Sequence, residues 1–163
     1  MKYFREIYNY IKNEKNSSYN ISNEDLNLYK KEESIILRSI GQDFKKKYFI
    51  YGKLHDCPIV SIKIDFTELK KCMISMTFLC NESKTNKTFT IFYTDVYDYS
   101  IKVSNSFISC FNMIKGNKCL ISEFSKDNRL YSHELAFSDG SRVIIRFKNA
   151  KSIYLNEEED KMY

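Results

Sequence analysis

The stretch "IVSIKIDF", residues Ile59–Phe66, decides the fold class of this chain. Apolar side chains occupy every second position, at Ile62, Ile64 and Phe66, with polar side chains between them. Because successive side chains of a strand point to opposite faces, this alternation indicates a strand with one buried and one polar face. One-sided strands are typical of antiparallel sheets rather than of buried parallel ones. We therefore expect an antiparallel sheet to begin here.

The same period of two continues toward the C-terminus. Residues 72–80 alternate in the same way, and the short link between the two runs suits a hairpin. Residues 107–114 also fit helical spacing, so a strand and a helix both stay open there. The further strand candidates are residues 87–94, 97–103, 107–114, 118–124, 130–137 and 142–148. Together these runs predict a sheet of about seven or eight strands.

The last hairpin, "LAFSDGSRVIIRF", can be read to the level of its turn. A two-residue Asp-Gly turn would place arginines on the side of Leu135 and Phe137. A three-residue loop, residues 138–140, instead gathers the apolar side chains of both strands on one face. Since a one-residue slip inverts every side chain, the hydrophobic pattern favours this bulged turn, with Gly140 in the left-handed region.

Upstream of the sheet the apolar period is helical. Residues 2–13 predict a short amphipathic helix, and Ser22 can cap a second helix whose apolar face extends to Tyr48. Gly41 weakens the C-terminal half of that helix. The predicted fold is α+β, with N-terminal helices packed on a curved, mostly antiparallel sheet. We expect one domain over residues 1–155, helical over 1–50 and sheet over 58–155, followed by an acidic tail at 156–163.

The junction between helices and sheet, "GKLHDCP", contains the first candidate site. His55, Asp56 and Cys57 supply an imidazole, a carboxylate and a thiol, the groups used in nucleophilic catalysis. In extended backbone, His55 and Cys57 would share a face while Asp56 points away, so a dyad is possible but a ready triad is not. The structural alternative is a corner, released by Gly52 and fixed by Pro58. The composition of the heptad favours the corner.

Two further candidates lie in the predicted sheet. His133 has the core-facing parity of Leu135, and whether it converges with His55 on a pocket stays open. A metal site would need His55, Cys57, His133 and a carboxylate, but no known ligand spacing supports one. Tyr93, Tyr97 and Tyr99 share one parity, so they form a candidate protein-binding strip if exposed, or an aromatic core face if buried.

Composition narrows the classes of protein. Hydrophobic residues make up 43% of the chain, which argues against disorder, and no apolar run is long enough to span a membrane. The net charge is +5, but the lysines are spread along the chain, so nucleic acid is not the expected partner. Five cysteines without a C-x-x-C pair favour free, mostly buried thiols in a cytoplasmic protein. No P-loop, dinucleotide fingerprint or nucleophile elbow is present, and we expect no cofactor.

The opening "MKYFREIY", the segment "LHDCPIVSIKID" and the late "HELAFSDGSRVIIRF" resemble a group of short uncharacterised proteins of Gram-positive bacteria. Members share an L-H-D motif at the start of a strand and a D-G hairpin near the C-terminus. The resemblance implies an antiparallel-sheet domain, and similar small proteins act as immunity proteins against toxins. It implies no catalytic residues.

These observations predict a non-catalytic binding protein whose partner is another protein, with a toxin-immunity role as its most concrete form. The alternative is a small metal-dependent or hydrolytic enzyme that uses His55, Cys57 and His133. Oligomeric state and strand order are not determined by the sequence.

Overall fold

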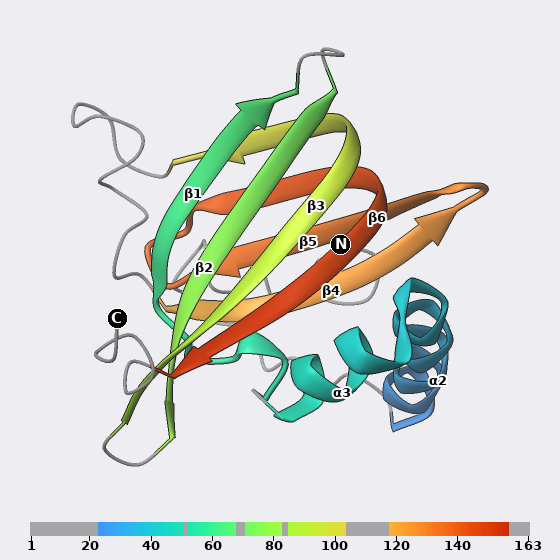
Figure 1. The fold of residues 1–163 in the computed structure, drawn as a ribbon. Helices are drawn as coiled ribbons and strands as arrows, with labels where there is room; N and C mark the ends of the chain where they lie inside the picture. The colour runs from blue at the N-terminus through green and yellow to red at the C-terminus, as the bar shows by residue number, and fades with distance from the viewer. Residues whose placement is uncertain (1–22, 51, 68–70, 83–84, 104–117, 157–163) are drawn as a thin grey trace.

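A computed structural model describes residues 23–50, 52–67, 71–82, 85–103 and 118–156 (Figure 1). Its helices are α2 (Asn23–Ile40), α3 (Gln42–Ile50) and a single 3-10 turn, η1 (Gly52–Leu54). Its strands are β1 (Ile59–Phe66), β2 (Cys72–Glu82), β3 (Thr85–Lys102), β4 (Cys119–Asp127), β5 (Leu130–Phe137) and β6 (Arg142–Asn156). The α+β class with an antiparallel sheet is therefore confirmed. The predictions for residues 2–13 and 107–114 lie outside the described residues, as does the acidic tail predicted at 156–163 except for Asn156, which ends β6.

The second predicted helix is two helices. The chain breaks at Gly41, between α2 and α3, where the sequence already weakened the helical pattern. The apolar positions on either side of the break face the sheet, and Leu37, Phe44 and Tyr48 are buried. The rings of Phe44 and Tyr48 both meet Phe124 of β4 edge-on, with centroids 5.7 and 5.3 Å apart. The helices therefore pack on the β4 side of the sheet.

The six strands form one antiparallel sheet in the order β1-β2-β3-β6-β5-β4. The described part of the chain has six strands rather than seven or eight, because segments 87–94 and 97–103 belong to the single strand β3 and segment 107–114 lies outside the described residues. The pairing of β3 with β6 shifts register between Val96 and Asp98, which is where the sequence suggested two separate strands. Asp95, just before the shift, has a positive φ of 51°. A bulge of this kind interrupts the alternation without ending the strand.

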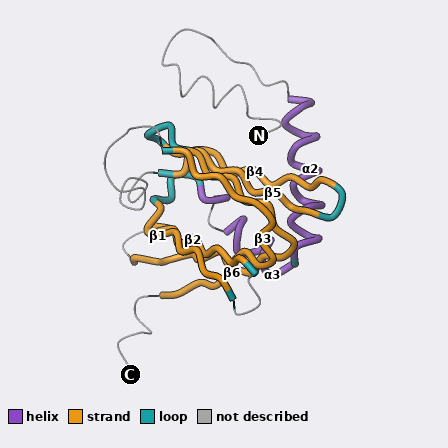
Figure 2. Tube along the Cα trace, turned by 90° about the horizontal axis from the view of Figure 1, so that it is seen from above, coloured by secondary structure: helices purple, strands orange, loops and turns teal. Residues whose placement is uncertain are grey.

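The two outer strands of the sheet meet at one end. Pro58, just before β1, forms an antiparallel bridge with Lys118, just before β4. The Asp56 amide donates to the Cys119 carbonyl at 2.8 Å, and the Cys119 amide donates to the Cys57 carbonyl at 3.1 Å. From above, β4 and β5 form a layer over β1 and β2 (Figure 2). The helix-to-sheet corner thus pairs with the far edge of the sheet.

The predicted three-residue hairpin between β5 and β6 is confirmed. The Phe137 amide donates to the Ser141 carbonyl at 3.0 Å, which leaves residues 138–140 as the loop. Gly140 has a φ of 82°, the left-handed value that its place in the turn requires. The apolar residues assigned to one face are all buried: Leu135, Phe137, Val143, Ile145 and Phe147. The hydrophobic pattern therefore selected the correct register.

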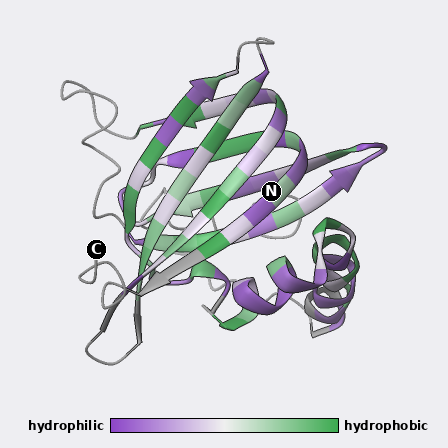
Figure 3. Ribbon diagram, viewed as in Figure 1, coloured by the Kyte–Doolittle hydropathy of each residue, from purple (hydrophilic) through white to green (hydrophobic). Residues whose placement is uncertain are grey.

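The core lies between the two layers of the sheet. Hydropathy alternates in bands along the strands, as one buried and one outer face require (Figure 3). β2 and β3 contribute Ile74, Met76, Phe78, Phe89, Ile91 and Tyr93, each at most 1% exposed. None of the described helices is long and apolar enough to cross a membrane.

Candidate functional site

The corner Gly52–Pro58 is tied to both the helices and the sheet. Lys53, Leu54 and Asp56 all have positive φ angles, between 58° and 65°, which non-glycine residues rarely adopt. Leu54 is fully buried and anchors the turn. The Lys53 ammonium contacts the fully buried carboxylate of Glu33 on α2. These contacts hold a backbone conformation that the local sequence alone would not favour.

The side chains of the corner are not arranged as expected. His55 Nδ1 lies 3.0 Å from Asp56 Oδ2, and both side chains are more than half exposed. Cys57 instead points into the core, with only 7% of its surface exposed. The expectation that His55 and Cys57 share a face, with Asp56 opposite, is therefore wrong. It assumed extended backbone, and the left-handed φ of Asp56 breaks that alternation.

His133 faces the core, as its parity predicted, and is fully buried. Its Nδ1 lies 2.6 Å from the Tyr93 hydroxyl, and its Nε2 lies 2.7 Å from the Ser122 hydroxyl. The ring of Phe124 stacks on the imidazole, with centroids 3.8 Å apart. Burial lowers the pKa of His133 to about 3, so the imidazole is neutral at neutral pH. A neutral imidazole carries one N–H, and so it donates to one hydroxyl and accepts from the other.

The hydrogen-bonded chain continues from the sheet to α3. The hydroxyls of Tyr48 and Ser122 are 2.7 Å apart, so Tyr48, Ser122, His133 and Tyr93 form one polar chain through the core. Sequence reasoning missed Ser122 and Tyr48. The inward parity of His133 implied that a partner exists, but nothing in the residues around His133 indicates which distant strand or helix supplies it.

The pair of Ser122 and His133 has the atoms of a nucleophile and its base, but its surroundings are those of a structural group. A general base must reach the proton of a group beside the substrate, and the His133 imidazole has no exposed surface. Both ring nitrogens already have hydroxyl partners. Burial also raises the pKa of Tyr93 well above its usual value, so the phenol is neutral. The chain satisfies polar groups in the core.

The three residues of the enzyme alternative have different partners. His55 contacts Asp56, Cys57 contacts the thiol of Cys80, and His133 contacts Tyr93 and Ser122. Among the described residues no group of three or more histidine, cysteine or acidic side chains is placed to hold a metal ion. No shared site of His55, Cys57 and His133 is visible in these contacts.

The three tyrosines of the predicted protein-binding strip differ in their exposure to solvent. Tyr93 is fully buried, whereas Tyr97 is 77% and Tyr99 41% exposed. The register shift between Val96 and Asp98 explains the difference, because a bulge resets the alternation of side chains along the strand. The three tyrosines therefore do not share one surface.

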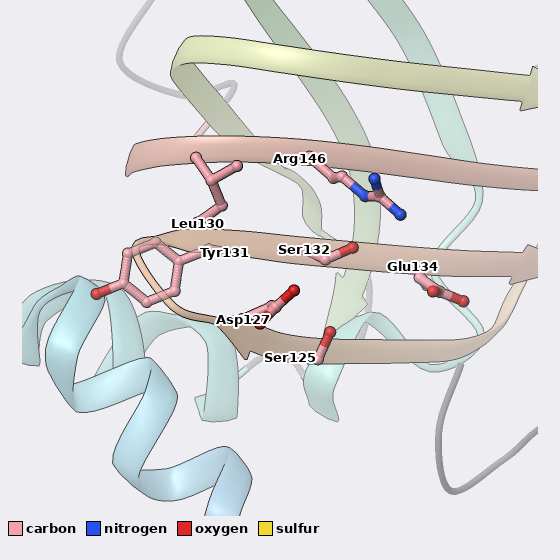
Figure 4. A pocket seen from close by; sticks show the side chains of 7 residues that line it. All are labelled: Ser125, Asp127, Leu130, Tyr131, Ser132, Glu134 and Arg146. Atoms are coloured by element: carbon pink, nitrogen blue, oxygen red, sulfur yellow. The ribbon is translucent and has the colours of Figure 1, made fainter.

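A pocket of about 220 Å³ lies on the outer side of β4, β5 and β6 (Figure 4). Ser125, Ser132 and Arg146 are direct neighbours across the three strands. Hydroxyls and a guanidinium suit an anion, but the carboxylates of Asp127 and Glu134 line the same pocket. Its mixed charge indicates no single class of ligand.

Comparisons with known proteins found no matching family model, no matching curated protein and no matching solved structure.

Proposed function

We propose that this chain is a protein-binding module and that its contact surface is the outer face of β2 and β3. Seven residues of these two strands point away from the core and are partly exposed: Ser75, Thr77 and Leu79 on β2, and Thr88, Thr90, Phe92 and Thr94 on β3. We call this set the hydroxyl face. None of the seven carries a charge, although 29% of the chain is charged. This depletion of charge is the observation that carries the proposal.

Charge depletion at the centre with charge at the rim is the compositional mark of protein interfaces. Small hydroxyl side chains lose little conformational freedom when a partner covers them, and Phe92 supplies a central aromatic group. The hydroxyls of Thr77 and Thr90 are 3.0 Å apart and fix each other across the two strands. The centre of the hydroxyl face is therefore ordered before a partner arrives.

One exposed lysine lies on each side of the hydroxyl face. One register row runs from Lys63 on β1 through Ser75 and Phe92 to Lys151 on β6. Both lysines are exposed. Three strand spacings separate them by about 14 Å. The partner that fits is a protein whose surface places carboxylates on both sides of an uncharged centre. The sequence resemblance adds a toxin as the class of partner.

Photo-crosslinking tests this function. The photoreactive p-benzoylphenylalanine replaces Phe92 in one variant, and Phe49, which is 41% exposed on α3, in a matched control. After irradiation in a lysate of the source cells, the variant at position 92 should give a specific adduct that the control lacks. Adding Thr90→Arg should abolish the adduct, because an unpaired charge would be buried in the contact. Adducts of equal yield at both positions, or an adduct that survives Thr90→Arg, would contradict the proposal.

The rate at which the same crosslinked adduct forms tests the role of the two flanking lysines. The double variant Lys63→Glu and Lys151→Glu should slow its formation several-fold, and added salt should slow the wild type in the same way. Lys46→Glu, an exposed change on α3, serves as the control. A rate that is insensitive to salt and to the rim lysines would exclude an acidic partner.

A further inference from the structure

The thiols of Cys57 and Cys80 form a close pair inside the protein. Their sulfur atoms are 3.0 Å apart, and the two side chains are only 7% and 3% exposed. Cys57 belongs to the corner before β1, and Cys80 lies near the end of β2.

The backbone places these residues opposite each other in an antiparallel ladder. Ile59 pairs with Phe78, and the Leu79 amide donates to the Pro58 carbonyl at 2.8 Å. Continued two residues beyond Ile59 and Phe78, the same register brings Cys57 opposite Cys80, at a position of the kind without direct hydrogen bonds between the two backbones. The Cα atoms of such pairs are about 4.5 Å apart, which falls within the range of disulfides at about 4.4–6.8 Å. This register and the 3.0 Å between the sulfur atoms suit a disulfide between the two residues.

The pKa of Cys57 shifts in the opposite direction from those of Cys72 and Cys119. The hydrogen bond from Cys80 lowers the pKa of Cys57, which favours the nucleophilic thiolate. Burial raises the pKa values of Cys119 and Cys72. Cys119 is fully buried and its thiol contacts the Ile121 carbonyl. Cys57 is also the more exposed member of the pair, so we expect it to react first.

We propose that Cys57 and Cys80 form a thiol–disulfide exchange site, which takes small disulfides of the oxidised glutathione class. The Cys57 thiolate attacks one sulfur of the small disulfide, forms a mixed disulfide and releases the first small thiolate, which takes up the proton that Cys57 lost. Cys80 then gives up its proton and attacks the Cys57 sulfur, which releases the second small thiolate. Two protein thiols are oxidised to one disulfide, and one small disulfide is reduced to two thiols.

The bond would fasten the corner to β2, beside the point where Cys57 and Cys119 join the two edges of the sheet. By restricting the unfolded chain over the segment between residues 57 and 80, it should raise the temperature of thermal unfolding by about 5–10 °C. Formation or reduction of this disulfide would thereby raise or lower the stability of the region where the corner before β1 meets β4.

Incubation of the full chain with mixtures of oxidised and reduced glutathione tests the site. Free thiols, counted after denaturation, should fall from five to three, and the mass should fall by two hydrogen atoms. Trypsin should yield residues 54–63 joined to residues 72–84. Because the second peptide contains both Cys72 and Cys80, the variant Cys72→Ser is the matched control, and it should form the same bond.

The mixed disulfide between Cys57 and glutathione distinguishes the first step, the attack by Cys57, from the second step, the attack by Cys80. Cys80→Ser should stop at a single glutathione adduct on Cys57, and Cys57→Ser should form neither adduct nor bond. Five free thiols after oxidation, a persistent adduct on the wild type, or a bond that involves Cys119 or Cys110 would each overturn the proposal. If a variant does not fold, fragmentation of the joined wild-type peptides 54–63 and 72–84 by mass spectrometry separates Cys80 from Cys72 and decides between these outcomes.

Discussion

The hydroxyl of Tyr93 lies 2.6 Å from Nδ1 of His133, and both side chains are fully buried. The two residues come from strands that are separated in the sheet by β6. Their hydrogen bond therefore spans the intervening strand on the core side of the sheet. Because a buried nitrogen without a partner is costly, this contact fixes the position of the imidazole in the apolar interior.

Removing the phenol oxygen of Tyr93 should lower the stability of the folded protein. Tyr93→Phe leaves Nδ1 of His133 without its partner, so we expect a loss of about 1–3 kcal/mol in the free energy of unfolding. Urea denaturation followed by circular dichroism measures it. Tyr97→Phe removes the same atom from a side chain that is 77% exposed and should change stability by less than about 0.5 kcal/mol. Equal losses in the two variants would show that the contact contributes nothing.

His133 should make the protein sensitive to acid. Burial lowers its pKa to about 3, whereas the ordinary value is 6.5, so between these values the unfolded chain binds a proton that the folded chain does not. The stability from this group is complete above pH 6.5 and is lost as the pH falls toward 3. Within that window the folding equilibrium constant should fall up to about tenfold for each pH unit.

Carboxylates also take up protons in acid and can change stability. Variants at the two histidines distinguish the contribution of His133 from that of the carboxylates. His133→Gln retains a hydrogen-bonding side chain but does not titrate, so urea unfolding between pH 7 and 4 should show a shallower loss of stability than in the wild type. His55→Asn changes the exposed histidine and should follow the wild type. Parallel curves for wild type and His133→Gln would rule out His133 as the origin of the acid sensitivity.

Lys53 should stabilise the corner through the buried carboxylate of Glu33, which also accepts a 2.6 Å hydrogen bond from Tyr29. Lys53→Met leaves that carboxylate without its cation, and we expect a loss of about 3 kcal/mol. The double variant with Glu33→Gln should recover part of the loss, because the uncompensated charge is gone. Lys47→Met, which breaks the more exposed pair with Asp43, should cost at most about 0.5 kcal/mol.

The turn before β6 depends on Gly140, whose φ is 82°. Gly140→Ala forces a side chain into the left-handed region and should destabilise the protein by about 1–2 kcal/mol. Asn128, in the turn between β4 and β5, has a φ of 52° and provides the opposite test. Asn128→Gly relieves the strain of a side chain there and should change stability by no more than about 0.5 kcal/mol. Thermal unfolding of both variants checks the pair.

Sequence by itself determined the features that depend on neighbouring residues. The period of two set the class of the sheet, and Gly41 marked the break between the helices. The bulged turn at residues 138–140 followed from the requirement that Phe137 and Val143 share a buried face. Such features are readable because side-chain direction repeats within a single strand or helix, and because a turn must connect two such patterns.

Only the tertiary structure decided which distant residues meet. The strand order brings the corner beside Cys119, places Cys57 opposite Cys80, and gives His133 its partners Tyr93 and Ser122. Alternation says that a side chain points inward but not what lies there, because that depends on the order of the strands. The left-handed φ of Asp56 also depends on the hydrogen bond of its amide to Cys119. The heptad that looked most like an active site is therefore shaped by its contact with the far edge of the sheet.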